Sequence, residues 1–132
     1  MEDGRSAVAV RLLDRALGEA PHAQARSDVR LELAEAHERE GNVAAATAVL
    51  GAILAETPGH AIAREQLLAL HLRQGDFPRA VADLQALAAS APDDTTRMAV
   101  ELRMGKLARD HMGDGPLALS AFVRALEIDP LG

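Results

Sequence analysis

The chain has 132 residues, of which 48% are hydrophobic and 26% charged, so it holds enough apolar material for the core of one ordinary domain. Its formal net charge is −6 and it has only two aromatic residues. Both features argue against nucleic-acid binding, which needs a basic face and aromatic stacking platforms.

Helical periodicity is visible from the first residues. Ala9, Leu13 and Ala16 recur at the spacing of one helix face, which predicts a helix over residues 5–20. Six further segments repeat this pattern, so we expect an all-α protein. The seven expected helices cover residues 5–20, 24–40, 43–56, 60–74, 77–90, 94–112 and 116–128.

Glycine and proline mark the ends of these helices. Three pairs combine a left-handed C-terminal residue with an N-capping side chain: Gly41-Asn42, Gly75-Asp76 and Gly113-Asp114. Pro78 and Pro116 lie in the first turns of new helices. The segments end at four prolines: Pro21, Pro58, Pro92 and Pro130. Connections this short predict antiparallel helix pairs.

The chain also repeats itself. Residues 41–58 resemble residues 75–92 and 113–130, and a less similar copy of the same pattern lies at 6–21. Aligned without gaps, residues 27–60 and 61–94 share 11 identities over a period of 34. We therefore expect one domain over residues 1–132, with a half repeat at 5–21 and full repeats at 27–60, 61–94 and 95–130. The first helix of the third repeat carries one extra residue.

The period and the small-residue pattern resemble the tetratricopeptide repeat family. The matched positions are Leu33-Ala34, Ala46, Leu50 and Pro58; Leu67, Ala80, Leu84 and Pro92; and Met104-Gly105, Ala118, Phe122 and Pro130. The departures are Arg30, Arg64 and Glu101 at the family's aromatic position, and His37, His71 and Ala108 at its tyrosine position. The resemblance implies a right-handed α-solenoid of helix-turn-helix repeats, with three full repeats after an N-terminal half repeat.

The resemblance also implies a non-catalytic module for protein–protein interaction, in which the first helices line a concave groove for a peptide or an amphipathic helix. The groove positions carried over are Asp28, Leu31, Glu35, Glu38, Arg39, Ile62, Glu65, Ala69, Leu72, Arg73, Ala99, Leu102, Lys106 and Arg109. We expect the partner's basic end near Glu35 and Glu38 and its acidic end near Lys106 and Arg109. A carboxylate clamp is not expected, because the matching positions hold Leu31, Glu35, Gln66 and Ala99, and only Arg103 suits one.

Chemical motifs are weak. His37 and His71 stand one repeat apart, too far to share an ion, so we expect them to be half-buried with local hydrogen-bond partners. The letters G-x-G-x-x-A at residues 113–118 follow a helix rather than the strand that a dinucleotide site requires. We therefore predict no enzyme activity, no metal and no cofactor.

The last helix suggests an alternative function, which is self-association. It is more apolar than its counterpart in the previous repeat, at Leu117, Leu119, Val123 and Ile128. Terminal repeats of a free-standing solenoid are normally polar outside. We therefore expect a segment of a larger scaffold, or a module that forms homodimers when isolated.

Location and source are inferred from the same composition. No apolar run is long enough to span a membrane and no secretory pattern is visible, so we expect a cytoplasmic protein without membrane contact. The basic residues are 13 arginines and one lysine, and alanine is abundant, which suggests a bacterium with a GC-rich genome.

Overall fold

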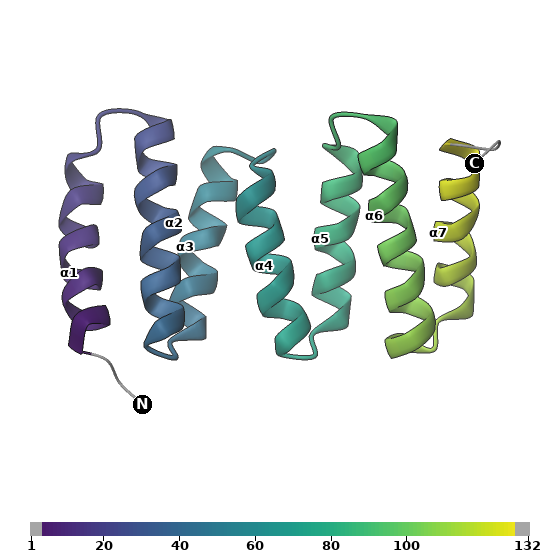
Figure 1. Cartoon of the computed structure of the whole chain (residues 1–132), viewed down its shortest axis with the longest axis horizontal. Coiled ribbons are helices and arrows are strands. Elements are labelled where there is room, and N and C mark those ends of the chain that lie inside the picture. The colour runs from purple at the N-terminus through teal and green to yellow at the C-terminus, as the bar shows by residue number, and fades with distance from the viewer. Residues whose placement is uncertain (1–3, 129–132) are drawn as a thin grey trace. The chain divides into compact units, whose positions relative to one another are not determined.

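The computed structural model describes residues 4–128, which contain seven α-helices and no strand (Figure 1). They are α1 (Gly4–Glu19), α2 (Ala23–Arg39), α3 (Val43–Glu56), α4 (Ala61–Arg73), α5 (Phe77–Ala89), α6 (Asp94–Leu107) and α7 (Gly115–Ile128). A π-helical turn, η1 (Ala108–Met112), continues α6. The all-α class and the seven expected helices are confirmed; Pro130, expected to follow the last helix, lies outside the described residues.

The chain divides into two compact units, an N-terminal unit (Met1–Leu67) and a C-terminal unit (Leu68–Gly132), with the boundary inside α4. In the N-terminal unit α2 packs against both α1 and α3. In the C-terminal unit α6 packs against both α5 and α7. Each unit is therefore built around a first helix held between two second helices.

The predicted helix ends are confirmed by the backbone. Gly41, Gly75 and Gly113 have φ values of 75°, 70° and 60°, the left-handed conformation that glycine adopts without steric cost. Each following side chain accepts a hydrogen bond from a backbone N–H of the next helix: Asn42 from Ala45, Asp76 from Arg79 and Asp114 from Leu117. These caps make the sharp reversals that bring paired helices together.

The extra residue of the third repeat is absorbed by η1. In the first two pairs the N–H after the glycine bonds a carbonyl five residues back, Asn42 to His37 and Asp76 to His71, both at 2.9 Å. In the third pair Asp114 reaches six residues back to Ala108, at 3.0 Å. The insertion therefore widens the last turn into a π-helix and leaves the glycine cap in place.

Small residues allow the helices to approach closely. In the N-terminal unit Ala46, Leu50 and Ile53 are fully buried, as their spacing predicts. The core of the C-terminal unit consists of Leu68, Ala80, Val81, Leu84, Leu87, Val100, Met104, Leu107 and Ala121. A Cβ atom on Gly105 would lie 2.6 Å from the Phe122 ring, so only glycine fits between α6 and α7 at this point.

The predicted buried face of α1 is partly wrong. Ala9 and Leu13 are half-buried, but Ala16 is exposed, while Ser6 is buried with 2% of its surface accessible. The reason is that α1 packs mainly against one neighbour, α2, so much of its surface stays uncovered, and Ser6 is its single buried residue among those described.

Two arginines of α2 hold the end of α3. Arg26 donates from Nε to Glu56 at 2.9 Å, and Arg30 donates from Nη1 to the other carboxylate oxygen at 2.7 Å. These two hydrogen bonds lower the pKa of Glu56 to about 2. Arg30, at the family's aromatic position, thus joins the two helices through charge instead of ring packing.

The Glu56 contacts predict a pH-dependent stability. Because the folded-state pKa is lowered from its ordinary value near 4.5 to about 2, the contribution is complete above pH 4.5 and is lost as the pH falls towards 2. We expect Glu56→Gln to lower the thermal midpoint at pH 7, by a small amount because the groups are partly exposed, and the two midpoints to converge in acid. Circular dichroism melts over this pH range measure the difference; a gap that does not narrow in acid contradicts the assignment.

His71 forms a buried polar pair with Asp83. The His71 Nδ1 atom lies 2.5 Å from Asp83 Oδ2, and the residues are 6% and 2% exposed. The prediction of a local partner is therefore confirmed for His71. It is wrong for His37, whose buried Nδ1 has no hydrogen-bond partner. Val49 stands where the preceding repeat would need the equivalent of Asp83, which explains the difference.

The same substitution at these equivalent positions should therefore have different effects. His71→Leu removes a hydrogen bond from a buried carboxylate and is expected to lower the free energy of unfolding by about 1–3 kcal/mol. His37→Leu removes a buried nitrogen without a partner, so stability should be unchanged or higher. Urea unfolding of both variants tests this, and equal losses would contradict the role given to Asp83.

Candidate partner-binding site

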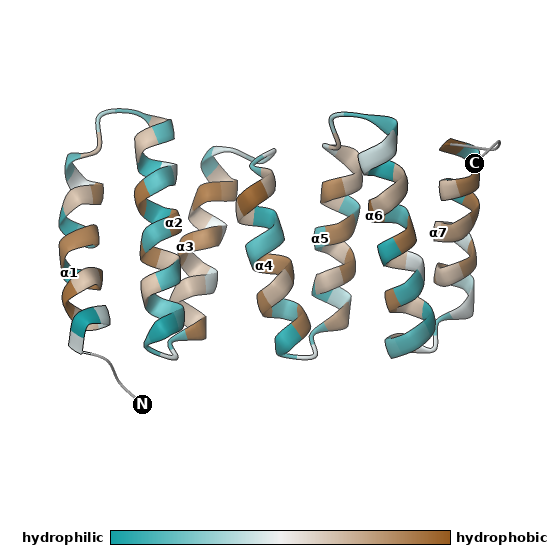
Figure 2. Cartoon of the chain, viewed as in Figure 1, coloured by the Kyte–Doolittle hydropathy of each residue, from teal (hydrophilic) through white to brown (hydrophobic). Residues whose placement is uncertain are grey.

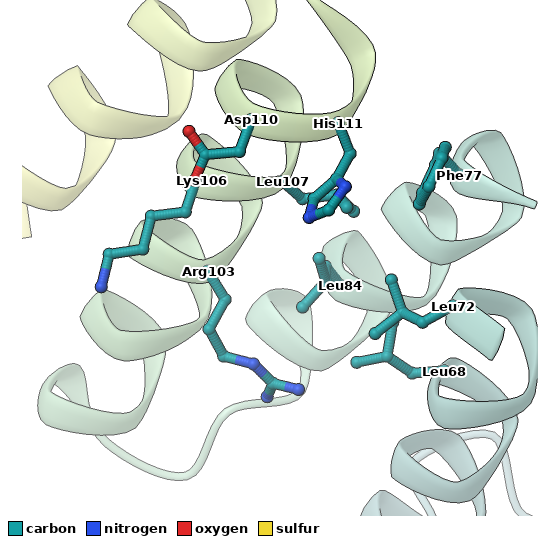
Figure 3. A pocket seen from close by; sticks show the side chains of 9 residues that line it. All are labelled: Leu68, Leu72, Phe77, Leu84, Arg103, Lys106, Leu107, Asp110 and His111. Atoms are coloured by element: carbon teal, nitrogen blue, oxygen red, sulfur yellow. The ribbon is translucent and has the colours of Figure 1, made fainter. Parts of the chain in front are cut away.

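The C-terminal unit contains a pocket of about 450 Å³ between α4, α5 and α6 with η1, which we call the Leu72 pocket (Figure 3). Its lining residues are Leu68, Leu72, Phe77, Leu84, Arg103, Lys106, Leu107, Asp110 and His111. Five of these are apolar and face one space in Figure 3, with the charged side chains around them. An apolar floor with a few polar groups at the edge is the usual composition of a ligand site.

The pocket's rim is cationic. Lys106 is exposed, extends outward in Figure 3 and forms no ion pair among residues 4–128. Asp110 is the single acid of the rim, and the hydrogen bond that Arg109 donates to it at 2.7 Å lowers the pKa of its carboxyl group. Arg109 pairs with Asp110, and among the lining residues the two cations, Arg103 and Lys106, outnumber this one acid, so the lining carries a formal charge of +1.

The π-helical turn shapes the end of the pocket. It carries Asp110 and His111, and the His111 ring stacks on Phe77 of α5, with ring centroids 5.4 Å apart and an interplanar angle of 26°. The buried Leu107 lies immediately before the turn. The inserted residue is thus located in the wall of the pocket, as π-turns at functional sites often are.

The predicted groove residues divide between the two units. Leu31, Glu35, Glu38, Arg39, Ile62 and Glu65 belong to the N-terminal unit, and Ala69, Leu72, Arg73, Leu102, Lys106 and Arg109 belong to the C-terminal unit. Within the latter, Leu72 and Lys106 are brought together in the pocket. Arg109 instead pairs with Asp110 and lies over the Phe122 ring, 5.9 Å from its centroid. Leu102 is half-buried and does not line the pocket.

Two charged groove positions of the N-terminal unit, Glu35 and Arg39, pair with each other. Glu35 accepts a hydrogen bond from Arg39 one turn later, at 2.5 Å. Ile62 is 59% exposed, more than Leu72, which is 39% exposed. The use of these residues by a partner stays a prediction.

Sequence reasoning missed most of the pocket lining. The missed residues are Leu68, Phe77, Leu84, Arg103, Leu107, Asp110 and His111. Asp110 occupies the position of Arg39 and Arg73, so the same alignment could have found it. His111 had no such signal, because its place over Phe77 depends on how the inserted residue is folded.

A second pocket, of about 430 Å³, lies between α5, α6 and α7. Its lining residues are Ala88, Ala89, Arg97, Glu101, Arg124, Glu127 and Ile128. Glu101, at the family's aromatic position, is only 4% exposed and forms an ion pair with Arg124. The two arginines and two glutamates of the lining give a formal charge of zero, although Arg97 pairs with Asp94 outside the lining and Glu127 forms no ion pair among residues 4–128.

The predicted self-association residues do not share one surface. Leu119 and Val123 are exposed, by 65% and 42%. Leu117 is half-buried and packs against the core of the unit, and Ile128 is half-buried in the second pocket. The prediction missed Leu126, which is 65% exposed. The exposed apolar face of α7 is thus Leu119, Val123 and Leu126.

No group of three or more His, Cys, Asp or Glu side chains within residues 4–128 is placed to hold a metal ion. None of the described helices combines the length and apolarity needed to cross a membrane.

Comparison with known proteins agrees with the repeat structure. The sequence model of the tetratricopeptide repeat family matches residues 1–69 and, in a second alignment, residues 38–101. Searches of curated proteins and of solved structures found no match. The two matched ranges cover most of the chain, and the helix pairs with their glycine ends agree with them. The chain belongs to the tetratricopeptide repeat family.

Proposed function

We propose that this chain is a non-catalytic module that binds a partner protein, and that the Leu72 pocket receives an apolar side chain of an acidic partner segment. Tetratricopeptide repeats generally mediate protein–protein interaction and are typically non-catalytic, which supports the class of function. The observation that carries the specific site is the combination of an apolar floor and a cationic rim in one pocket.

The floor supports an apolar anchor. Leu72 is 39% exposed, whereas Leu68 and Leu84 beside it are 1% and 2% exposed. A side chain entering the pocket would cover the exposed part of Leu72 and the faces of Phe77 and Leu107 that line it. Such burial contributes roughly 25 cal/mol per Å² of apolar surface removed from water.

The rim supports an acidic partner. A carboxylate next to the anchor would lie near Lys106, where opposite charges attract and a basic segment would be repelled. This agrees with the expectation that the partner's acidic end lies near Lys106. The continuation of a groove into the N-terminal unit, the cytoplasmic location and the bacterial origin stay predictions.

A phage-displayed library of short peptides, selected on the immobilised chain, tests this function. We expect enrichment of sequences that combine a large apolar residue with Asp or Glu. Leu72→Glu should weaken the selected peptides by more than about tenfold, because it places a charge in the apolar floor. Lys106→Glu should weaken them less, and its effect should shrink in high salt.

Leu12→Glu is the matched control, since Leu12 is an exposed leucine of α1 in the other unit. It should bind the selected peptides as the wild type does. Peptides that bind Leu72→Glu and Lys106→Glu with unchanged affinity would show that the pocket is not the site.

A further inference from the structure

The exposed face of α7 is an apolar stripe. Leu119, Val123 and Leu126, at positions i, i+4 and i+7, share one side of the helix, and we call them the α7 stripe. The opposite side, with Ala118, Ala121 and Ala125, is buried. Figure 2 shows apolar residues along most of α7. Because α7 packs against α6 through its buried side, the stripe is turned away from its own unit.

The charge next to the α7 stripe is negative. Glu127 follows Leu126 directly, is exposed, and forms no ion pair among residues 4–128. Arg124 is the single cation among the described residues of α7, and it is directed to Glu101 and to the Met104 sulfur, 3.7 Å from its Nη2 atom. The stripe thus presents leucine and valine side chains beside a carboxylate.

The Leu72 pocket offers the complementary surface. Its floor is apolar and its rim carries Lys106, so it matches both properties of the α7 stripe. None of its lining residues belongs to α7, and the stripe faces outward, so a chain cannot fill its own pocket with it. An α7 stripe that enters the pocket is therefore that of a second copy.

We propose that a second copy of this chain inserts its α7 stripe into the Leu72 pocket, with Glu127 beside Lys106. This inference rests on the proposed function, because it names one partner of the same pocket. The two surfaces are different, so the contact is heterologous. In a pair, the copy that inserts its stripe keeps an unused pocket, and the copy whose pocket is filled keeps an unused stripe. Association therefore extends beyond the dimer as concentration rises, and a partner segment bound in the pocket competes with it.

The α7 stripe fits the Leu72 pocket better than the exposed apolar face of α1 does. On α1, Val8 and Leu12 are 45% and 63% exposed, but Arg15 stands less than one turn after Leu12. An arginine there would meet the cationic rim of the pocket, where like charges repel. Leu12→Glu is therefore a control for the self-association as well.

Sedimentation analysis of two complementary variants tests the proposal. Leu72→Glu lacks a working pocket but keeps its stripe, and Leu126→Glu lacks a working stripe but keeps its pocket. Each alone is expected to be monomeric at concentrations where wild type and Leu12→Glu form dimers and larger species. Mixed in equal amounts, the two variants should form a dimer that grows no further, because each supplies the surface that the other lacks.

This mixing result also shows that both variants are folded. A wild type that stays monomeric at high concentration, or a mixture that stays monomeric while wild type associates, would overturn the proposal. The charge pair is tested separately: Glu127→Lys should weaken association by at least about tenfold, and combining it with Lys106→Glu should restore it.

Failure of this proposal can be told apart from failure of the proposed function. Peptides selected on the wild type should still bind the Leu126→Glu variant, and they should dissociate wild-type oligomers by competing for the pocket. If peptides bind the pocket but wild type is monomeric, the self-association proposal is wrong and the partner-binding function stands. If oligomers form and no peptide competes, the pocket assignment that both proposals use is wrong.

Discussion

The close contact between small-residue helix faces is the constraint on which the rest of the structure depends. Ala46 and Ala80 are completely buried, and Gly105 lies against the Phe122 ring with no room for a methyl group. With only two aromatic residues in the chain, bulky packing is not available as a substitute. The helices must approach until these faces meet, and this sets which other residues remain at the surface.

Charged residues hold the positions that rings occupy in the family. Arg30 joins α2 to α3 through Glu56, and the buried Glu101 joins α6 to α7 through Arg124. Such pairs hold their geometry by charge and hydrogen bonds, and buried ones contribute less net stability than a well-packed apolar replacement. Glu101 also lines the second pocket, together with Arg124.

The sequence predicted the repeated parts of the structure well. The helix ends could be located from the repeat period and from the glycine and capping residues. A helix end depends on local backbone conformation and capping, and each repeat carries the same residues for it. The buried face of α3 was also predicted, whereas that of α1 was wrong at Ala16, since periodicity cannot show how far one neighbour covers a helix. Likewise Leu117 packs inward and Leu126 outward, although both are apolar.

The candidate site was harder to predict because it depends on the place where the repeat is broken. One extra residue was visible in the sequence, but only the hydrogen bond from Asp114 to Ala108 shows that it forms a π-turn. That turn brings His111 over Phe77 and closes one end of the Leu72 pocket. A departure from the repeat pattern thus contributes Asp110 and His111 to the pocket.

A methyl NMR titration of the chain with the tightest selected peptide tests the central claim most directly, because it locates the contact without any substitution. The account predicts that the largest shifts occur at Leu68, Leu72, Leu84 and Leu107 around the pocket. Shifts confined to the methyl groups of α1 or to those lining the second pocket, with these four leucines unmoved, would contradict it.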